Sequence, residues 1–510
     1  MEVMLDGKGL TRAQVVNVAR GGASVTLTED AKTRIAASRD RVEALADSET
    51  PAYGISTGFG ALASVFIAPD RRTELQRALI RSHAAGVGPA VEPEIVRATM
   101  LLRLRTLAMG FSGVRPELVD QLAGLLESGI APVVPEFGSL GCSGDLAPLA
   151  HIALVLMGEG RALLPDGQEV DGAEALATAG LSPIELASKE GLALINGTDG
   201  MLAHLVLTCA DSALLLKGAD LAAAMSIEGL LGTDRTFLPD LTVLRPHPGQ
   251  AASARNLVRL LDGSGILASH RDGHSRVQDA YSMRCAPQVT GAARDTLDWV
   301  RQVVDRELDA AIDNPVVLED GRVASSGNFH GAPLALAADF LAIAMADIGS
   351  IAERRIDRML DHHRSDGLPP FLGADPGVDS GMMIAHYSAA ALVAENRRLA
   401  APASVDSIPT SAMQEDHVSM GWAACRKLRT LLVNLRRVVS IELMTAARAI
   451  ELRGPLTASP ATAAVIRRLR NEVPGAGPDR FLAPEIEATD GLLGSGALVA
   501  AAEEITGELE

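Results

Sequence analysis

Residues 138–151 read GSLGCSGDLAPLAH, and this stretch decides how the rest of the chain is interpreted. Ser143 stands directly before Gly144, and the acidic residue Asp145 follows. Because glycine lacks a Cβ atom, the amide of Gly144 approaches the carbonyl of Cys142 more closely than the amide of any other residue type. Attack of this amide on the carbonyl, with loss of water, closes a five-membered ring. Loss of water from the Ser143 side chain then leaves an exocyclic methylene, a strong electrophile made from backbone alone.

Other interpretations of a loop rich in glycine and serine fit less well. Such a loop, taken alone, is most often only a turn. A hydrolase nucleophile elbow needs the pattern Gly-x-Ser-x-Gly, but Asp145 stands two residues after Ser143. A phosphate-binding loop needs a Lys-Ser/Thr ending, which is absent here.

The whole stretch resembles the signature of the histidine/phenylalanine ammonia-lyase family, whose Ala-Ser-Gly tripeptide cyclises to methylidene-imidazolone (MIO). Here Cys142 takes the place of the alanine. The first residue gives only its carbonyl to the ring, so its side chain stays outside. The resemblance implies an MIO cofactor formed from Cys142, Ser143 and Gly144, and neither a metal nor a nucleotide.

The composition excludes several classes of partner. The 510 residues include 46 Lys and Arg against 64 Asp and Glu, a formal net charge of −18. Nucleic acid and anionic membrane surfaces are therefore not expected partners. Residues 1–6 lack the basic and apolar regions of a signal peptide, and no run of eighteen apolar residues predicts a membrane span. The four cysteines are scattered, which is typical of reduced thiols in the cytoplasm.

Helical periodicity dominates the chain. One helix is expected over 116–129, and three longer ones over 199–230, 333–361 and 420–453. Thirty helical residues span about 45 Å, which favours an elongated, mainly α-helical bundle that continues into subunit interfaces. We expect an amino-terminal part, 1–200, that carries a lid loop and the tripeptide. The long-helix bundle and carboxy-terminal helical part follow over 201–510, all within one lyase unit.

Residues 53–60 read YGISTGFG and place a tyrosine among three glycines. A single tyrosine near glycines is usually a packed turn residue. The segment is similar to the family's Tyr-Gly-Ile-Asn-Thr-Gly-Phe-Gly, with Ser56 in place of asparagine. The resemblance implies a lid that carries Tyr53 over the substrate, and the glycines give it hinge freedom.

Residues 277–285 read VQDAYSMRC and bring an amide, a carboxylate, a phenol and a guanidinium close together. The planar fork of arginine suits an α-carboxylate, and a phenol near positive charge can ionise and act as a base. The family's version is Gln-Asp-Pro-Tyr-Ser-x-Arg-Cys. The resemblance makes Tyr281 the base, Arg284 the carboxylate clamp and Gln278 a substrate-positioning amide.

Two more segments match the family. Residues 189–198, KEGLALINGT, are closely similar to the family's Lys-Glu-Gly-Leu-Ala-Leu-x-Asn-Gly-Thr. The resemblance implies that Asn196 lies near the MIO oxygen or the substrate carboxylate, in an oxyanion-type role. Asp199 follows, where family members often have glutamine. Residues 327–331, GNFHG, match the family's Gly-Asn-Phe-His-Gly, and the resemblance implies that Phe329 lies beside the electrophile.

His83 and Glu415 point to the substrate. Taken singly, His83 is a cap or surface residue and Glu415 a solvated charge. Together they resemble the histidine branch of the family, in which this pair faces the substrate imidazole. A carboxylate in a closed pocket needs an N–H donor, which imidazole supplies and phenyl does not, and an unpaired polar group costs about 1–3 kcal/mol. Tyrosine is excluded less firmly, because its hydroxyl could pair with His83.

Metal binding is not expected. His270 and His274 have helical i, i+4 spacing and His362 and His363 are adjacent, but neither pair has a third ligand in the pattern of a known zinc motif. We interpret all four as surface or capping residues.

Six motifs occur in family order between about residues 50 and 430. The resemblance implies a homotetramer whose active sites draw residues from three subunits, and deamination of L-histidine to trans-urocanate and ammonia, the first step of histidine degradation. We favour capture of the amino group by the electrophile, although attack on the imidazole stays open.

Three alternatives stand beside this interpretation. A tyrosine or phenylalanine ammonia-lyase or aminomutase with the same MIO stays open, as does a helical scaffold without catalysis. Retention of the whole set of motif residues argues against the scaffold. The fumarase/aspartase superfamily is rejected, because its Ser-Ser-x-x-x-Pro-x-Lys-x-Asn loop is missing.

Overall fold

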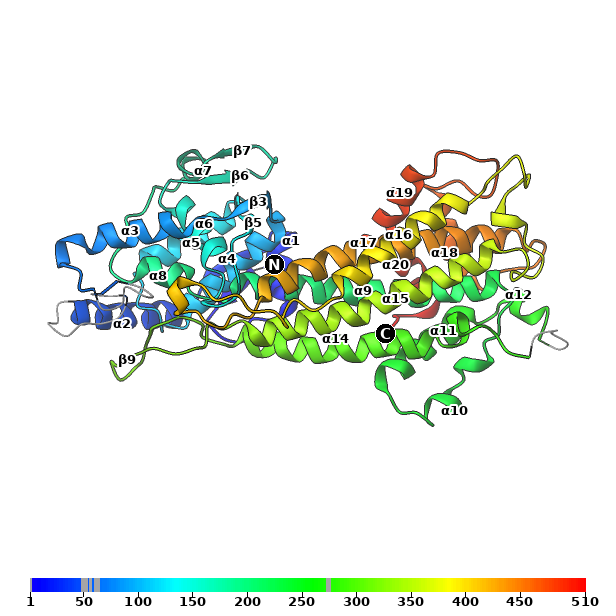
Figure 1. Cartoon of the computed structure of the whole chain (residues 1–510), viewed down its shortest axis with the longest axis horizontal. Helices are drawn as coiled ribbons and strands as arrows, with labels where there is room; N and C mark the ends of the chain where they lie inside the picture. The colour runs from blue at the N-terminus through cyan, green and yellow to red at the C-terminus, as the bar shows by residue number, and fades with distance from the viewer. Residues whose placement is uncertain (1, 47–53, 55–56, 59–64, 272–276) are drawn as a thin grey trace. The chain divides into compact units, whose positions relative to one another are not determined.

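The structure is a computed structural model that describes residues 2–46, 54, 57–58, 65–271 and 277–510 (Figure 1). Within these residues the chain is mainly helical, and its strands are 2 to 4 residues long. The expected mainly α-helical class is confirmed.

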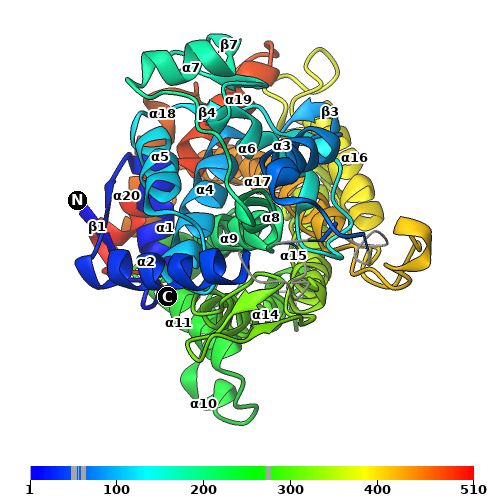
Figure 2. The same cartoon turned by 90° about the vertical axis from the view of Figure 1, so that its left-hand side faces the viewer.

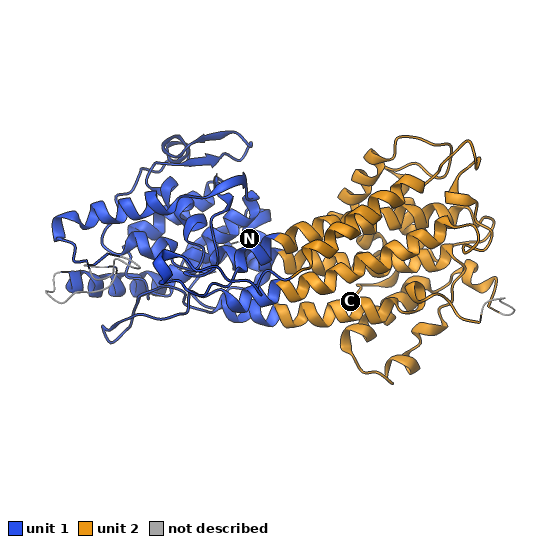
Figure 3. Ribbon diagram, in the orientation of Figure 1, with its two compact units in different colours: residues 1–207, 301–338, 402–426 blue, residues 208–300, 339–401, 427–510 orange. Residues whose placement is uncertain are grey.

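The chain folds into two compact units (Figure 3). Unit 1 contains residues 1–207, 301–338 and 402–426, and unit 2 contains residues 208–300, 339–401 and 427–510. The division expected from the sequence, an amino-terminal part over 1–200 and a helical part over 201–510, stays a prediction. The compact units have different boundaries from that division, because the chain returns twice to unit 1 after leaving it.

Four long helices contain residues of both units. They are α9 (Asp199–Gly229), α14 (Ala286–Leu308), α15 (Ala332–Leu360) and α17 (Gly421–Glu451). The predictions for 199–230, 333–361 and 420–453 are confirmed to within about two residues at either end. The helix α17 stops three residues before Gly454-Pro455, as expected from the inability of proline to continue a helix. The helix α5 (Pro116–Glu127) begins on its proline, as predicted.

Unit 1 is built around α4 (Pro93–Ala108), in which every side chain from Ala98 to Ala108 is buried. A helix that is covered on all sides forms a core rather than a surface. The other helices of this unit are α1 (Arg12–Gly21), α2 (Glu29–Ala46), α3 (Arg72–His83), α6 (Leu146–Leu156), α7 (Gly172–Thr178) and α8 (Glu190–Ile195). Helix α6 packs against both α3 and α8 (Figure 2). This packing brings together the carboxyl end of α3, the amino end of α6 and the carboxyl end of α8.

Short strands complete unit 1. Strands β1 (Glu2–Leu5) and β2 (Ser24–Leu27) pair in parallel, and β3 (Val87–Ala90) pairs antiparallel with β5 (Pro135–Phe137). Strands β4 (Ala131–Pro132), β6 (Arg161–Leu163) and β7 (Glu169–Asp171) form an antiparallel sheet in that order. Strands β8 (Val316–Val317) and β9 (Val323–Ala324) form a ribbon.

Unit 2 combines parts of the long helices with shorter ones. These are α10 (Pro239–Thr242), α11 (Pro248–Leu261), α12 (Gly265–Ala268), α13 (Tyr281–Arg284), α16 (Met383–Leu399), α18 (Pro460–Arg470), α19 (Ala483–Gly494) and α20 (Ala497–Thr506). In its core, Arg355 Nη2 lies 2.9 Å from Glu442 Oε2, and Ser226 Oγ donates to Glu442 Oε1 at 2.7 Å. Each charge is thus paired where it is buried, as burial requires.

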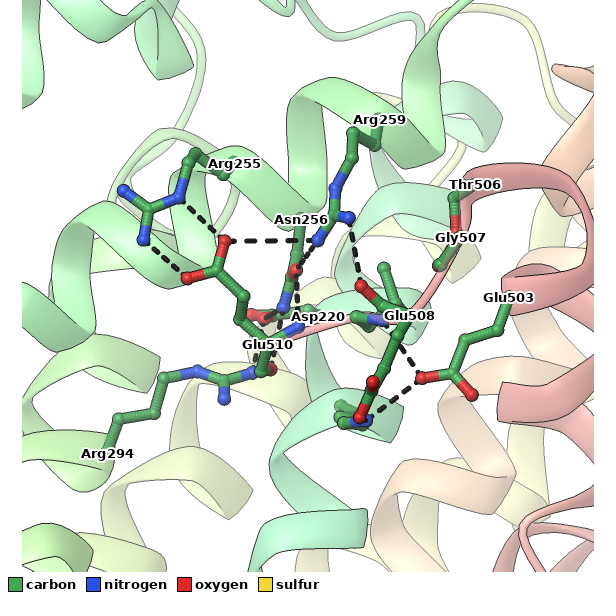
Figure 4. A network of polar contacts seen from close by, with 12 residues as sticks. Asp220, Arg255, Asn256, Arg259, Arg294, Glu503, Thr506, Gly507, Glu508 and Glu510 are labelled. Atoms are coloured by element: carbon green, nitrogen blue, oxygen red, sulfur yellow. Dashed lines mark hydrogen bonds and ion pairs between the residues drawn. The ribbon is translucent and has the colours of Figure 1, made fainter.

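A polar network holds residues 508–510 against α11 and continues to Asp220 on α9 and Arg294 on α14 (Figure 4). Asp220 Oδ2 accepts hydrogen bonds from Asn256 Nδ2 at 2.9 Å and from Arg294 Nη2 at 2.7 Å. Arg255 Nε donates to Glu510 Oε1 at 2.7 Å, and the Glu510 amide donates to Asn256 Oδ1 at 3.0 Å. The network therefore fixes this segment in unit 2 through several charged groups at once.

In the part of the chain that the structure describes, two segments are long and apolar enough to cross a membrane by length and composition alone, Glu190–Gly229 and Ala332–Leu360. Of their most apolar stretches, 78% and 61% respectively are buried inside the protein. Core helices of this length pass the same test, so these two are weak evidence for a membrane span. All four cysteines are described, and none is in a disulfide.

Candidate active site

The tripeptide Cys142–Gly144 lies directly before α6, with Asp145 at the amino-terminal cap position of that helix. Gly144 has φ +75°, and a Cβ atom at this position would lie 2.2 Å from the carbonyl oxygen of Gly197. Both the left-handed conformation and the lack of space require glycine here. The local structure therefore fits a tripeptide whose third residue must be glycine.

Asp145 ties this loop to the start of α9. Its amide donates to the Gly197 carbonyl at 2.7 Å, and its fully buried carboxylate accepts from Ser139 Oγ and from the Met201 amide, both at 2.9 Å. Burial raises the pKa of Asp145 to about 7, although these hydrogen bonds oppose the rise. The tripeptide is thus held between α6 and α9 by backbone and side-chain bonds.

A cavity of about 1040 Å³ opens beside the tripeptide in unit 1. Six of the residues predicted from the sequence line it: His83, Cys142, Ser143, Asn196, Phe329 and Glu415. They come from α3, the tripeptide loop, the end of α8, the loop before α15 and the loop before α17. The fold therefore collects into one cavity residues that span more than 300 positions of the sequence.

Glu415 accepts hydrogen bonds on both carboxylate oxygens. Ser143 Oγ donates to Oε1 at 3.0 Å, while Thr410 Oγ1 and Ser411 Oγ donate to Oε2, both at 3.0 Å. The thiol of Cys142 also lies 3.6 Å from Oε2. Burial opposes ionisation, but the donors outweigh it and hold the pKa of Glu415 below its usual value. The carboxylate is therefore ionised near neutral pH.

The negative charge of Glu415 acts on its neighbours. Burial, together with this carboxylate, raises the pKa of the Cys142 thiol to about 11, so the thiol stays protonated. Cys142 is consequently a weak hydrogen-bond donor rather than a nucleophile in this cavity.

His83 ends α3, and its Nδ1 lies 2.9 Å from the carbonyl oxygen of Leu79. A carbonyl only accepts, so Nδ1 carries the hydrogen and Nε2 is left as an acceptor in the neutral ring. Burial lowers the pKa of His83, and the Leu79 carbonyl and Glu415 oppose this without reversing it. The cavity is thus lined by the ionised carboxylate of Glu415 and the neutral imidazole of His83, among other residues.

Asn196 follows α8, and its Nδ2 donates to the Asn314 carbonyl at 3.2 Å. Its Oδ1 is buried and has no hydrogen-bond partner among the described residues. A buried acceptor without a partner costs free energy, so it favours a bound molecule that brings a donor. Asn196 therefore fits a polar contact with a ligand in this cavity.

Three predicted residues belong to unit 2. Tyr281 and Arg284 begin and end the short helix α13, and the Arg284 guanidinium lies 5.0 Å from the centre of the Tyr281 ring. Gln278 and Arg284 line a separate cavity of about 360 Å³ within unit 2. Tyr281 is 72% exposed in the single chain. Tyr53 lies outside the described residues.

The chain matches the aromatic amino acid lyase family over residues 10–471. The chain belongs to this family. The family resemblance inferred from the six motifs is therefore confirmed.

Known members of the aromatic amino acid lyase family resemble this chain over its full length. A histidine ammonia-lyase of Streptomyces avermitilis is 60% identical over 508 residues, which cover 99% of each chain. A solved histidine ammonia-lyase of Trypanosoma cruzi has a TM-score of 0.91 at 40% identity, over 99% of this chain and 96% of that one. A tyrosine aminomutase of Streptomyces globisporus has a TM-score of 0.95 at 40% identity and covers both chains completely.

Residues that the sequence did not single out also line the lyase cavity. The rings of His330 and His417 stack at 5.7 Å with an angle of 3° between their planes. His330 Nε2 is buried without a hydrogen-bond partner among the described residues. His330 directly follows Phe329, and His417 stands two residues after Glu415, so their positions within family motifs were the available signal. Thr410 and Ser411 had no such signal, because their role depends on the folding of their loop.

Asp199, where many family members have glutamine, does not line the cavity. Its carboxylate lies 3.4 Å from the guanidinium of Arg103, and both side chains are 2% exposed. Thr106 Oγ1 donates to Asp199 Oδ1 at 3.3 Å. The aspartate therefore neutralises a buried arginine under the start of α9.

Within the described residues no group of three or more His, Cys, Asp or Glu side chains could hold a metal ion. His270 Nε2 lies 2.9 Å from the Gly232 carbonyl, and the rings of His362 and His363 lie 3.7 Å apart. His274 is outside the described residues. The expected absence of a metal from this lyase stays a prediction.

Proposed function

We propose that this chain is a histidine ammonia-lyase that converts L-histidine to trans-urocanate and ammonia. The observation that carries the proposal is the ionised Glu415 beside the tripeptide, in the same cavity as the neutral His83. An ionised carboxylate that lines a cavity can accept a hydrogen bond from a substrate N–H, which imidazole offers and phenyl does not. The high identity to proteins named histidine ammonia-lyase supports the same assignment.

The cofactor in this proposal is MIO, formed from Cys142, Ser143 and Gly144. The amide nitrogen of Gly144 bonds to the carbonyl carbon of Cys142, and the carbonyl oxygen leaves as water with the amide hydrogens of Ser143 and Gly144. The Ser143 Oγ leaves as a second water with the Cα hydrogen of the same residue. The cradle that excludes a Cβ at Gly144 and the free acceptor of Asn196 support this group. When formed, it supplies an electrophile that turns the amino group into a leaving group.

The residues of the cavity bind and orient the substrate in this proposal. Glu415 accepts the imidazole N–H, and His83 Nε2 faces the same ring from the end of α3. Asn196 contacts the polar end of the amino acid, and Phe329 packs beside the electrophile. Each role follows from the donor, acceptor or apolar surface that the side chain offers in the cavity.

Tyr281 takes the β-proton and Arg284 holds the α-carboxylate, with Gln278 as a positioning amide. The Arg284 guanidinium lies 5.0 Å from the centre of the Tyr281 ring, so the proposed clamp and the proposed base are close neighbours on α13. We propose that another subunit of a homotetramer brings these groups, and Tyr53 as a lid, to the cavity. The 72% exposure of Tyr281 and the 99% exposure of Val277 in the single chain support coverage by a second copy.

We place the enzyme in the cytoplasm, and the four scattered cysteines, none of them in a disulfide, support this location. Its partners are its substrate and further copies of itself. Nucleic acid and membranes are not among them in this proposal.

The second candidate is a tyrosine ammonia-lyase or aminomutase with the same cofactor. The observation that favours it is the structural likeness to the tyrosine aminomutase of Streptomyces globisporus, with its TM-score of 0.95. Against it, a phenol offers a single O–H, which His83 and Glu415 would have to share. The imidazole presents both a donor and an acceptor to this pair.

Purified protein incubated separately with L-histidine, L-tyrosine and L-phenylalanine, without added cofactor, tests the proposal. Ultraviolet absorbance follows the conjugated acid, chromatography follows any β-amino acid, and intact mass reports loss of two waters. Urocanate from histidine alone, with the mass loss, supports the proposal. Coumarate, cinnamate or a β-amino acid would overturn the substrate assignment. An unchanged mass together with no turnover would overturn the catalytic assignment.

A further inference from the structure

A left-handed turn ends at Met413, two residues before Glu415. Ser411, Ala412 and Met413 have φ values of +51°, +54° and +71°, although none of them is glycine. Each left-handed residue with a side chain costs about 1 kcal/mol or more, so the surrounding contacts must hold three in a row. Such strain is typical of functional segments, and it raises the question of what the turn positions.

The turn joins Thr410 to Glu415 through their backbones. The amide of Thr410 donates to the Glu415 carbonyl at 3.0 Å, and the amide of Met413 donates to the Thr410 carbonyl at 3.0 Å. This closure places the hydroxyls of Thr410 and Ser411 on the carboxylate of Glu415. A turn in the ordinary right-handed conformation would direct these two hydroxyls elsewhere.

The loop is also fixed to the tripeptide. Ser419 Oγ donates to the Gly141 carbonyl at 2.6 Å, and the Met420 amide donates to the Leu140 carbonyl at 2.9 Å. The carboxylate of Glu415 is therefore held from both sides, by the turn before it and by the anchored residues after it.

The two oxygens of Glu415 have different partners. Oε2 has the hydroxyls of Thr410 and Ser411 and the thiol of Cys142, whereas Oε1 has only Ser143 Oγ among the described residues. The second loss of water described above, which forms the exocyclic methylene, removes that hydroxyl. Oε1 then loses the one donor that the described residues give it, while Oε2 keeps its three.

We infer that Thr410 and Ser411 are positioning residues that fix Oε2 of Glu415, so that Oε1 becomes the acceptor for the substrate N–H once the Ser143 hydroxyl has left. This inference rests on the proposed histidine ammonia-lyase function and deepens it. It also gives the strained turn a role, because the turn sets the direction in which the free oxygen points. Neither Thr410 nor Ser411 takes part in bond making.

The titratable groups around Glu415 come from several segments. His83 lies on α3, Cys142 in the tripeptide loop, His330 before α15, and Asp416 and His417 on the same loop as Glu415. Thr410 and Ser411 are neutral at all pH values of interest, so removing them changes the pKa of Glu415 only through lost hydrogen bonds. Their loss therefore raises that pKa, since both bonds stabilise the charged form.

The test uses Thr410→Val and Ser411→Ala in the full-length enzyme, with Thr410→Ser as the conservative rescue. Thr178→Val is the matched control, because this exposed hydroxyl on α7 bonds to the Glu174 carbonyl of its own helix, away from the cavity. For each variant, intact mass reports ring formation, and steady-state kinetics with L-histidine give KM, kcat and the pH dependence of kcat/KM.

The expected result is complete ring formation in every variant. The value of kcat/KM falls by about 10-fold for each hydroxyl removed, mainly through KM, and its acidic limb moves to higher pH. Thr410→Ser and Thr178→Val behave as the unchanged enzyme.

Three outcomes separate the inference from the proposed function. If the unchanged enzyme does not act on histidine, the proposed function is overturned, and the inference that rests on it is overturned as well. If it acts on histidine but the variants keep its KM and its acidic limb, only the inference is overturned. If the variants lose the ring itself, the two hydroxyls serve ring formation rather than substrate positioning, which also overturns it. Ser411→Ala removes one exposed hydroxyl from a surface turn and is expected to fold. If Thr410→Val does not fold, the kinetics of Ser411→Ala alone decide between these outcomes.

Discussion

Ser143 Oγ donates a hydrogen bond of 3.0 Å to Glu415 Oε1, although 272 residues separate the two in sequence. One partner is the proposed source of the electrophile, and the other is the proposed recognition group for the substrate ring. Because these two side chains are hydrogen-bonded to each other, the proposed electrophile and the proposed recognition group are direct neighbours in the cavity. A substrate as small as an amino acid can therefore meet both.

Replacement of Ser143 by alanine should abolish the electrophile. Without Oγ no second water can leave, so the exocyclic methylene cannot form. We expect kcat with L-histidine to fall by at least about 1000-fold, with the fold unchanged. Intact mass spectrometry checks the cause, because the variant should lack the full two-water loss. Activity near that of the unchanged enzyme would show that Ser143 is not the source of the electrophile.

Replacement of Glu415 by glutamine should impair recognition of the imidazole. The amide removes the negative charge and presents an NH₂ group that competes for the acceptors around it. A charge-assisted hydrogen bond contributes about 1.5–3 kcal/mol, so we expect kcat/KM for L-histidine to fall by roughly 10- to 100-fold. Steady-state kinetics measure this, and ring formation followed by mass serves as the control. Equal activity on histidine would contradict the assigned role.

Replacement of Gly144 by alanine should disrupt the tripeptide loop. The new Cβ would lie 2.2 Å from the Gly197 carbonyl oxygen, which no side-chain movement relieves. We expect destabilisation by about 2–4 kcal/mol in denaturant unfolding and loss of ring formation. Gly167→Ala is the matched control, since Gly167 has φ +87° but no atom within 4 Å of the place that a Cβ would occupy. A comparable loss in the control would assign the effect to backbone strain rather than to the collision.

The stability of unit 2 should depend on pH through Glu353. His386 Nε2 lies 2.6 Å from Glu353 Oε1, and Arg354 pairs with the same carboxylate. Burial alone would raise the pKa of Glu353, but these partners outweigh it and lower the pKa to about 2. A carboxyl with a lowered pKa stabilises the folded state above its unfolded value of about 4.5, and this contribution is lost as the pH falls toward 2.

Glu353→Gln should therefore reduce the free energy of unfolding by about 1–3 kcal/mol at pH 7 and by progressively less below a pH of about 4.5. Urea unfolding at several pH values between about 7 and 3 measures the difference. Arg398 also lowers the pKa of Glu395 on α16, but solvent screens this exposed ion pair, so Glu395→Gln should show a much smaller pH-dependent loss. A difference for Glu353→Gln that stays constant with pH would rule out the ion-pair explanation.

Asp199→Asn should destabilise the fold without changing recognition of the substrate. The variant leaves the buried guanidinium of Arg103 without its counter-charge, which costs about 3–5 kcal/mol. Denaturant unfolding should show this loss, while KM for L-histidine of the folded variant stays unchanged. An altered KM with unaltered stability would instead place Asp199 in the substrate site.

The sequence predicted the helical class and the long helices because their signals are local. In 420–453, for example, apolar residues three and four positions apart, such as Leu428, Leu431 and Leu435, indicate one face of a helix. The identity of Gly144 was also readable locally, although the sequence argument concerned ring closure. The structure adds that the Gly197 carbonyl occupies the space of a side chain there.

Other parts of the site could not be read from the sequence. Asp199 stands next to a motif of the site, yet it turns inward to Arg103, because a buried guanidinium from another helix requires a counter-charge. In the sequence, Thr410 and Ser411 look like any other hydroxyl residues of a loop. In the structure, the left-handed turn directs both hydroxyls toward the carboxylate of Glu415. Such contacts depend on where separate segments meet in space, and no local pattern encodes that.

The sequence by itself determined the family, the reactive tripeptide and the residue types available for catalysis. These are readable because each motif is a short contiguous segment, and the proposed ring forms from three consecutive residues. Only the tertiary structure decided which of those residues share a cavity and which protonation state each one holds. Burial and hydrogen bonding set these states: they keep Glu415 ionised, His83 neutral and Cys142 a thiol. All three depend on neighbours contributed by distant segments, since desolvation and hydrogen bonds act through space and not along the chain.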